Sequence, residues 1–180
     1  MTREVRSATT DDVWAIHETA RESWHAAYDD LLGSDRVDEI VDDWYAIGDL
    51  ESAITAASER ETVVFLVAVP DSDADLESEH GFDGECHGFA HVVPWPEDDS
   101  VAYLARLYVH PDRWGDGIGT TLVSRLEDEL VASFDRLRLA VLADNDGGIA
   151  FCEAMGFDRL ATRPNDLAPG LEEYVYEKPL

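Results

Sequence analysis

The feature that most restricts the fold of this chain is a glycine-rich segment between an extended apolar stretch and an amphipathic one. Glycines alternate at positions 115, 117 and 119, shortly after the apolar stretch that ends at Val109. Apolar residues then recur at helical spacing, at Ile118, Leu122, Val123, Leu126 and Leu130. Glycine lets a ligand approach the backbone closely, and a helix start leaves N–H groups unpaired at the positive end of its dipole. The pattern predicts a strand–loop–helix unit that binds a diphosphate.

Three phosphate-binding motifs compete for this segment. A P-loop needs a lysine after its last glycine, and the one lysine of the chain is Lys178. The dinucleotide fingerprint reads G-x-G-x-x-G, whereas these glycines run G-x-G-x-G. Asp144 could serve as the ribose-binding acid of that motif, but the loop from His110 to Gly115 is long for its tight turn. A dinucleotide oxidoreductase is therefore the weaker alternative, and the third motif is a coenzyme A loop.

The remaining sequence alternates between strand and helix patterns, which predicts one α/β or α+β domain over residues 1–180. Strands are expected over 3–7, 62–69, 85–93, 101–109, 136–142, 157–162 and 172–177, and the strands 85–93 and 101–109 should be antiparallel neighbours. Helices are expected over 11–24, 35–45, 118–132 and 148–155, with a further short helix over 50–57. Residues 71–84 read as a solvated loop. The resulting order is βααβββαβαββ.

The charge balance excludes several classes of partner. The chain has 40 acidic and 13 basic residues, for a net charge of −27, so nucleic acids and anionic membranes would be repelled. At molar salt the Debye length falls to about 3 Å, which screens repulsion among the carboxylates. Five tryptophans argue against a disordered acidic chain. This composition predicts adaptation to a halophilic cytoplasm.

Cysteine content and hydropathy add to this expectation. Two cysteines, Cys86 and Cys152, do not suggest a disulfide framework. No charged-then-apolar leader opens the chain, and the longest apolar run, from Val63 to Val69, is far shorter than the roughly 20 residues of a membrane span. We expect a cytoplasmic protein without a bound metal.

Two segments resemble the GNAT superfamily of acetyl-CoA-dependent N-acetyltransferases. Leu107–Pro111 is similar to the family's L-Y-V-x-P strand end, and Trp114–Gly119 to its [RQ]-x-x-G-x-[GA] loop, with tryptophan where arginine or glutamine is usual. Asn145–Phe157 resembles its N-x-x-A-x-x-F-Y-x-x-x-G-F block, with Gly148 in place of alanine and Cys152 in place of tyrosine. The stretch Ser23–Tyr28 is also similar to many small-molecule members, so the resemblance spans nearly the whole chain.

The resemblance implies a mixed, mostly antiparallel, splayed sheet flanked by helices, with acetyl-CoA between two diverging strands. The strand ending at Val109 would diverge from the strand near Leu139, and the pantetheine arm would lie in that gap. The residues implied in cofactor binding are Leu107, Tyr108, Val109, Arg113, Trp114, Gly115, Asp116, Gly117, Ile118, Gly119, Thr120, Asn145, Phe151 and Cys152.

The catalytic residues are less well specified. Direct attack of an amine on a thioester needs an unprotonated amine, and the backbone N–H of Val109 is the candidate for polarising the thioester carbonyl. His91 is the candidate base, with a packed strand histidine as the alternative. Cys152 stands at the family's usual acid position, but a buried cysteine that only packs is the other interpretation. Tyr108 is a substitute acid.

Four further residues are candidates for the acceptor side, with ordinary core or sheet packing as the alternative for each: Trp24, Tyr28, Tyr103 and Arg106. The leading functional hypothesis is acetylation of a primary amine of a small molecule. Acetylation of a protein N-terminus or lysine is the second, and a non-catalytic CoA-binding sensor is the third. The resemblance is also compatible with a homodimer.

Overall fold

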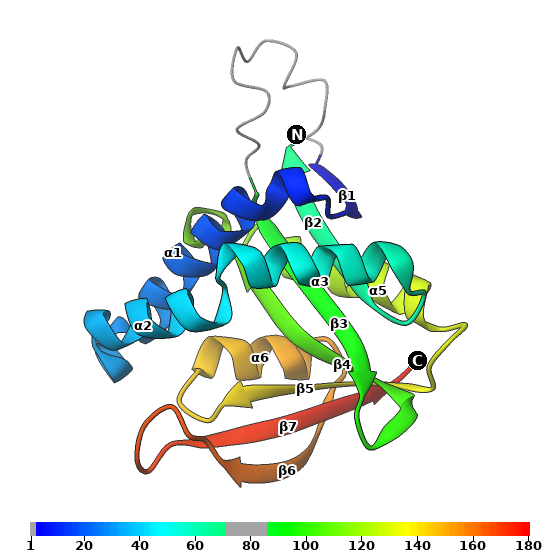
Figure 1. Ribbon diagram of the computed structural model, residues 1–180. Helices are drawn as coiled ribbons and strands as arrows, with labels where there is room; N and C mark the ends of the chain where they lie inside the picture. Colours follow the sequence, from blue (N-terminus) through cyan, green and yellow to red (C-terminus); the bar gives the residue numbers. More distant parts are fainter. Residues whose placement is uncertain (1–2, 71–85) are drawn as a thin grey trace.

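A computed structural model describes residues 3–70 and 86–180 and contains one seven-stranded sheet (Figure 1). The strands follow the order β1-β2-β3-β4-β5-β7-β6. All neighbouring strands are antiparallel except β4 and β5, which are parallel. The strands are β1 (Arg3–Ser7), β2 (Val64–Pro70), β3 (Gly88–Trp95), β4 (Asp98–Val109), β5 (Arg136–Leu142), β6 (Asp158–Pro164) and β7 (Glu172–Pro179).

Helices cover both faces of this sheet. The helices are α1 (Val13–Leu32), α2 (Ser34–Trp44), α3 (Ile47–Glu59), α5 (Ile118–Leu130) and α6 (Asp146–Ala154), and short 3-10 turns span Thr10–Asp12 and Pro111–Arg113. One buried cluster joins α1, α2 and α3 to the face that carries Phe65 and Phe89. A second cluster joins α5 and Cys152 of α6 to the opposite face, which carries Ala90 and Leu104. Figure 1 shows α3 and α5 on opposite sides of the sheet.

The fold agrees with the sequence prediction in its class and in all seven strands. The first strand and the strand 136–142 match residue for residue. The first helix is longer than predicted because it continues to Leu32, and the third helix is a full one of 13 residues. The predicted strand start at residue 85 and the predicted loop 71–84 lie outside the described residues. Within the described ranges, no helix has the length and hydropathy needed to span a bilayer.

The feature that positions the site is the divergence of β4 from β5. The two strands pair only over Val101–Tyr103 and Arg136–Arg138. Directly after this contact, β4 carries a bulge, because His91 faces Arg106 while Val92 faces Leu104, which leaves Ala105 as the extra residue. A bulge bends its strand and increases the local twist. Among residues 3–70 and 86–180, the carboxyl-terminal half of β4 therefore has no strand partner on its β5 side.

An ion pair fixes the connection between β1 and α1. The carboxylate of Asp12 accepts hydrogen bonds from Arg6 at 2.8 and 2.9 Å and from the Thr9 N–H at 2.8 Å. The Asp12 side chain is only 10% exposed. Burial by itself would raise the pKa of Asp12, but the Arg6 guanidinium and the Thr9 N–H together lower it below its usual value.

We expect Asp12→Asn to lower the free energy of unfolding by about 1–3 kcal/mol near neutral pH, because it leaves Arg6 without its anionic partner. A carboxylate whose pKa is depressed by folding stabilises the protein above its unfolded pKa of about 3.9, and this contribution is lost as the pH falls through the folded pKa. Urea unfolding in molar KCl should therefore show a difference between wild type and variant that shrinks below about pH 4. A difference that does not change with pH would contradict this account.

Candidate functional site

The start of α5 presents a row of unpaired backbone donors. Among the residues that the structure describes, no acceptor pairs with the N–H groups of Ile118, Gly119 or Thr120, and the first helical bond runs from Thr121 N–H to the Gly117 carbonyl at 3.0 Å. The N-cap position is Gly117, so no side chain caps the helix. These donors lie at the positive end of the helix dipole, an arrangement that suits an anion.

Two glycines give this loop its shape and leave room in front of it. Gly115 and Gly117 have φ values of +86° and +82°, a region that side chains with a Cβ rarely adopt. A Cβ at either position would meet no atom within 4 Å, so the space in front of the loop is open. Arg113 of the preceding turn is half-buried and forms no ion pair in the described part of the chain. The loop thus combines free amides, open space and a nearby cation.

The edge of β4 continues this row of donors and acceptors. His110 N–H donates to the His87 carbonyl at 2.9 Å, and bonded pairs alternate along an antiparallel ladder. Val109 and Leu107 therefore direct their N–H and C=O groups away from β3, toward the side that β5 has left. The indole N–H of Trp114 donates to the Val109 carbonyl at 2.7 Å. Of the two Val109 backbone groups at this edge, the N–H is therefore the one that remains available.

The far side of the gap is formed by the start of α6. Asn145 caps this helix, because its Oδ1 accepts from the Gly148 N–H at 2.9 Å. Its Nδ2 donates to the Tyr28 hydroxyl at 3.0 Å, which links α6 to α1. The substitution of alanine by Gly148 has a physical reason here, since a Cβ would lie 2.7 Å from Asn145 Nδ2. The Phe151 ring lies against Gly119, where a Cβ would approach it to 3.1 Å.

These residues fit a coenzyme A molecule. The unpaired amides of α5 suit a diphosphate, and the unpaired edge of β4 suits an extended amide-containing arm. The structure brings together the predicted residues of the loop, Leu107, Val109, Asn145 and Phe151. It places Tyr108 differently, because Tyr108 is on the opposite face of β4, among the aromatic rings of Trp24, Tyr45 and Phe89 at 5.7 to 5.9 Å.

The contacts of His91 fit a structural role better than the base role. Its ring is 8% exposed and stacks on Phe65 with centroids 4.9 Å apart. Its Nδ1 lies 3.4 Å from Arg106 Nη1, and a guanidinium can only donate, so the lone pair of Nδ1 points at Arg106. Burial, and then the Arg106 charge, lower the pKa of His91 to about 4. A base would need its free lone pair directed toward the amine.

Of the two candidate acids, Cys152 is buried and Tyr108 is partly buried. Cys152 is 3% exposed within the cluster under α5, and burial raises the pKa of its thiol to about 12. These observations favour the packing interpretation of Cys152. Burial and the neighbouring Tyr45 raise the pKa of Tyr108 well above its ordinary value, so Tyr108 stays protonated but is a weak proton donor.

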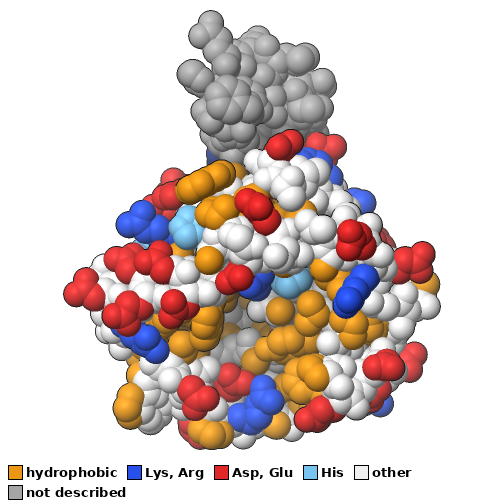
Figure 2. Space-filling model, viewed as in Figure 1, with side chains coloured by type: hydrophobic (Ala, Val, Ile, Leu, Met, Phe, Trp, Pro, Cys, Tyr) orange, Lys and Arg blue, Asp and Glu red, His pale blue; other side chains and the backbone are white. Residues whose placement is uncertain are grey.

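Figure 2 shows a hollow on the face that carries α2 and α3, with hydrophobic side chains along it and Lys or Arg side chains at its edge. Behind this face Trp24 and Tyr28 are buried, at 3% and 8% exposure. Tyr103 stacks edge-on against Trp95 at 5.1 Å, and Arg106 lies over the Tyr45 ring at 5.2 Å. Trp24 and Tyr28 thus belong to the core beneath this side, while Tyr103 and Arg106 are half-buried.

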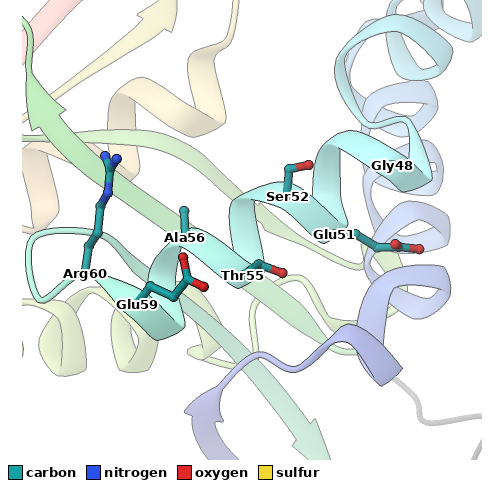
Figure 3. Close-up of a pocket in the computed structure, with 7 residues that line it drawn as sticks. All are labelled: Gly48, Glu51, Ser52, Thr55, Ala56, Glu59 and Arg60. Atoms are coloured by element: carbon teal, nitrogen blue, oxygen red, sulfur yellow. The ribbon is translucent and has the colours of Figure 1, made fainter.

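A separate depression of about 380 Å³ follows the outer surface of α3 (Figure 3). Its lining residues are Gly48, Glu51, Ser52, Thr55, Ala56, Glu59 and Arg60. All of them come from one helix and its C-cap, and none comes from the glycine loop or β4. We therefore assign the depression to the helix surface and not to the site.

Three features of this region are not predicted from the sequence. The Trp114–Val109 hydrogen bond could have been suspected from the tryptophan at a position where the resemblance expects a polar side chain. The Tyr45 ring contacts both Arg106 and Tyr108, but no sequence motif distinguishes Tyr45 from any other aromatic residue at the end of a helix. The bulge at Ala105 has no sequence signal, because neither glycine nor proline occurs between Val101 and Val109.

Comparisons with known proteins agree with this geometry. The model of the Acetyltransferase (GNAT) family matches residues 16–157. PaiA N-acetyltransferase from Thermoplasma acidophilum, solved with coenzyme A, has 23% identity and a TM-score of 0.82, with 100% of each chain covered. The yncA protein from Salmonella typhimurium, solved with its cofactor acetyl-CoA, has 19% identity and a TM-score of 0.73, with 100% of this chain and 95% of the other covered. No curated protein sequence gives a significant match.

We expect Gly117→Glu and Gly119→Glu to abolish acetyl-CoA binding in calorimetry. Glutamate at 117 would strain a backbone with φ of +82° and bring a negative charge to the anion site. Glutamate at 119 would collide with the Phe151 ring. Gly48→Glu is the control, because it adds the same charge on α3 where a Cβ meets nothing within 4 Å. Unchanged affinity in both loop variants would show that the amides of α5 do not hold the cofactor.

Proposed function

Because the chain belongs to the GNAT family of acetyltransferases, whose members use acetyl-CoA, we propose that it acetylates a primary amine of a small molecule. The observation that carries this proposal is the gap between β4 and β5. Free amides of α5 lie at one end of this gap, and an open hollow occupies the face that carries α2 and α3. A hollow of this kind suits a small acceptor that must approach the backbone edge of β4.

The residues of this chain would act mainly by binding and positioning. When bound, acetyl-CoA supplies an activated thioester whose acetyl carbon accepts an amine. The N–H groups of Ile118, Gly119 and Thr120 would hold the diphosphate against the overall charge of −27. The Val109 N–H would donate to the thioester carbonyl, where negative charge develops. Asn145, fixed by its cap to Gly148 and its bond to Tyr28, would orient the arm.

We further propose that the amine reaches the site already unprotonated. His91 directs its Nδ1 lone pair at Arg106, and the segment Val101–Val109 contains no Asp or Glu. The Cys152 thiol is buried, and a thiolate leaves without protonation more readily than an amine does. The chain then contributes orientation and carbonyl polarisation in place of a dedicated acid and base.

Acetylation of a protein N-terminus or lysine is the second candidate. It would need the hollow to accept an extended peptide, and the acidic surface would favour a basic one. Binding of CoA without transfer is the third candidate. Release of free thiol from acetyl-CoA with a panel of small amines and basic peptides, in molar KCl, separates the three. Thiol release with peptides alone, or CoA binding without thiol release, would contradict the small-molecule proposal.

The acidic composition supports a further part of the proposal, namely that the protein works in a salty cytoplasm as one domain over residues 1–180. Carboxylates outnumber cations three to one, which disfavours nucleic acids and anionic membranes as partners. A homodimer is compatible with this proposal, and light scattering in molar KCl would measure it.

If no protein base acts, the pH dependence of kcat/KM should follow the acceptor. The rate should rise with pH up to the pKa of each amine and then level off, so that two amines of different pKa give two different profiles. A transition fixed near pH 6.5 for every acceptor would instead reveal a histidine base of ordinary pKa, about 6.5. His91, with its pKa near 4, should cause no transition in that range.

We expect the free energy of unfolding to increase between about 0.1 and 1 M KCl, as the Debye length shortens from about 10 to 3 Å and repulsion among the carboxylates is screened. Chemical unfolding at a series of KCl concentrations measures this trend. NaCl should act similarly if screening is the cause. Stability that falls with added salt would rule out the halophilic interpretation.

A further inference from the structure

Arg106 faces the same side of the sheet as the hollow because of the bulge in β4. Strict alternation would place Tyr103 and Arg106 on opposite faces, since they are three residues apart. The extra residue Ala105 restores Arg106 to the side of Tyr103, opposite His91 in the register. Arg106 also contacts the carboxyl-terminal end of α2, where its Nη2 donates to the Trp44 carbonyl at 2.9 Å. The guanidinium therefore lies between β4 and α2, on the proposed acceptor side.

Neutral groups hold this guanidinium in place. It lies over the Tyr45 ring with its Cζ 5.2 Å from the centroid, and Nη1 approaches His91 Nδ1 at 3.4 Å. A ring, an imidazole and a backbone carbonyl orient the guanidinium fork but leave its positive charge uncompensated. His91 cannot reverse this charge, because protonating Nδ1 would place a second cation beside the first.

No carboxylate forms an ion pair with Arg106 anywhere in the described part of the chain. Two other arginines of the same sheet do have such partners, since Arg138 is bound to Glu177, and Arg163 lies 2.6 Å from Glu173. Carboxylates are three times as frequent as cations in this sequence. A half-buried arginine without a carboxylate partner therefore indicates a binding role, because a partly desolvated charge is normally paired.

We infer that Arg106 binds a carboxylate of the acceptor, so that the substrate is an amine that also carries a carboxylate group. This inference rests on the proposed acetylation of a small amine. The planar guanidinium matches a carboxylate in two parallel hydrogen bonds. A phosphate dianion fits less well, since it would face one unpaired arginine within a chain of net charge −27.

The competing role for Arg106 is structural. Its bond to the Trp44 carbonyl caps the carboxyl end of α2, where a cation is favourable. That role would change stability and would affect all acceptors alike. The carboxylate role changes the discrimination between matched acceptors, so the two roles differ in a measurable ratio.

The test compares propylamine, β-alanine and O-phosphoethanolamine as acceptors for wild type, Arg106→Gln and Arg106→Lys in molar KCl. We expect wild type to prefer β-alanine over propylamine by about tenfold or more in kcat/KM, and Arg106→Gln to remove that preference. Arg106→Lys, which keeps the charge but loses the planar fork, should retain part of it. Arg163→Gln is the matched control, because its arginine is already paired with Glu173, and its preference should equal that of wild type.

The inference would be overturned by equal use of propylamine and β-alanine by wild type, or by an equal loss for both amines in Arg106→Gln. A preference for O-phosphoethanolamine over β-alanine would overturn the carboxylate assignment. Calorimetry of the same ligands on the CoA-loaded protein separates binding from turnover. Arg106-dependent binding of β-alanine without thiol release would uphold the inference and reject acetylation of these amines.

A spectroscopic readout is independent of turnover and of α2 capping. In an NMR titration, bound β-alanine should raise the pKa of His91 from its value of about 4, because the carboxylate offsets the Arg106 charge beside the ring. In Arg106→Gln the pKa of His91 should already be higher and should not respond to β-alanine. A His91 pKa that ignores β-alanine in wild type would count against the inference.

Discussion

The arrangement of the site depends on the early end of the pairing between β4 and β5. Three residue pairs hold these parallel strands together, and the bulge at Ala105 then turns β4 away. A sheet that stayed paired would satisfy the backbone groups of Leu107 and Val109 with those of β5. Because the strands diverge, the backbone groups of Leu107 and the Val109 N–H remain available to a ligand, while the Val109 carbonyl accepts from Trp114. The helix α5 begins with its own unpaired amides at the end of β4.

The unpaired amides at the start of α5 are important because the net charge of the chain opposes binding of an anionic cofactor. A chain with a net charge of −27 repels an anionic cofactor at long range, so attraction must come from groups at short distance. Main-chain N–H groups at a helix start provide it without adding a titratable side chain. Two half-buried arginines that form no ion pair in the described part of the chain, Arg113 beside the loop and Arg106 on the acceptor side, add cationic side chains to this region.

The catalytic residues are the part of the site that the sequence predicts least well. The position of His91 on the strand beside β4 predicts a base, but Phe65 and Arg106 bury its ring, and its Nδ1 lone pair points at Arg106. The position of Cys152 in the motif predicts an acid, yet its side chain lies in the cluster under α5. Both outcomes depend on which face of an element a residue occupies and on what packs there, and neither can be read from spacing alone.

The sequence by itself determined the strand–loop–helix unit, the placement of its glycines and the seven strands, because local periodicity and glycine placement act over a few residues. The tertiary structure alone decided that Tyr103 and Arg106 lie on the same face of β4. It also decided that the Trp114 indole N–H donates to the Val109 carbonyl and that Asn145 Nδ2 donates to the Tyr28 hydroxyl. These contacts join segments that alternation and spacing do not relate, or depend on a bulge that periodicity cannot reveal. They form only once strand register and helix packing are fixed. Hydrogen bonds and ion pairs depend on the distance between two groups in space, and separation along the chain does not reveal that distance.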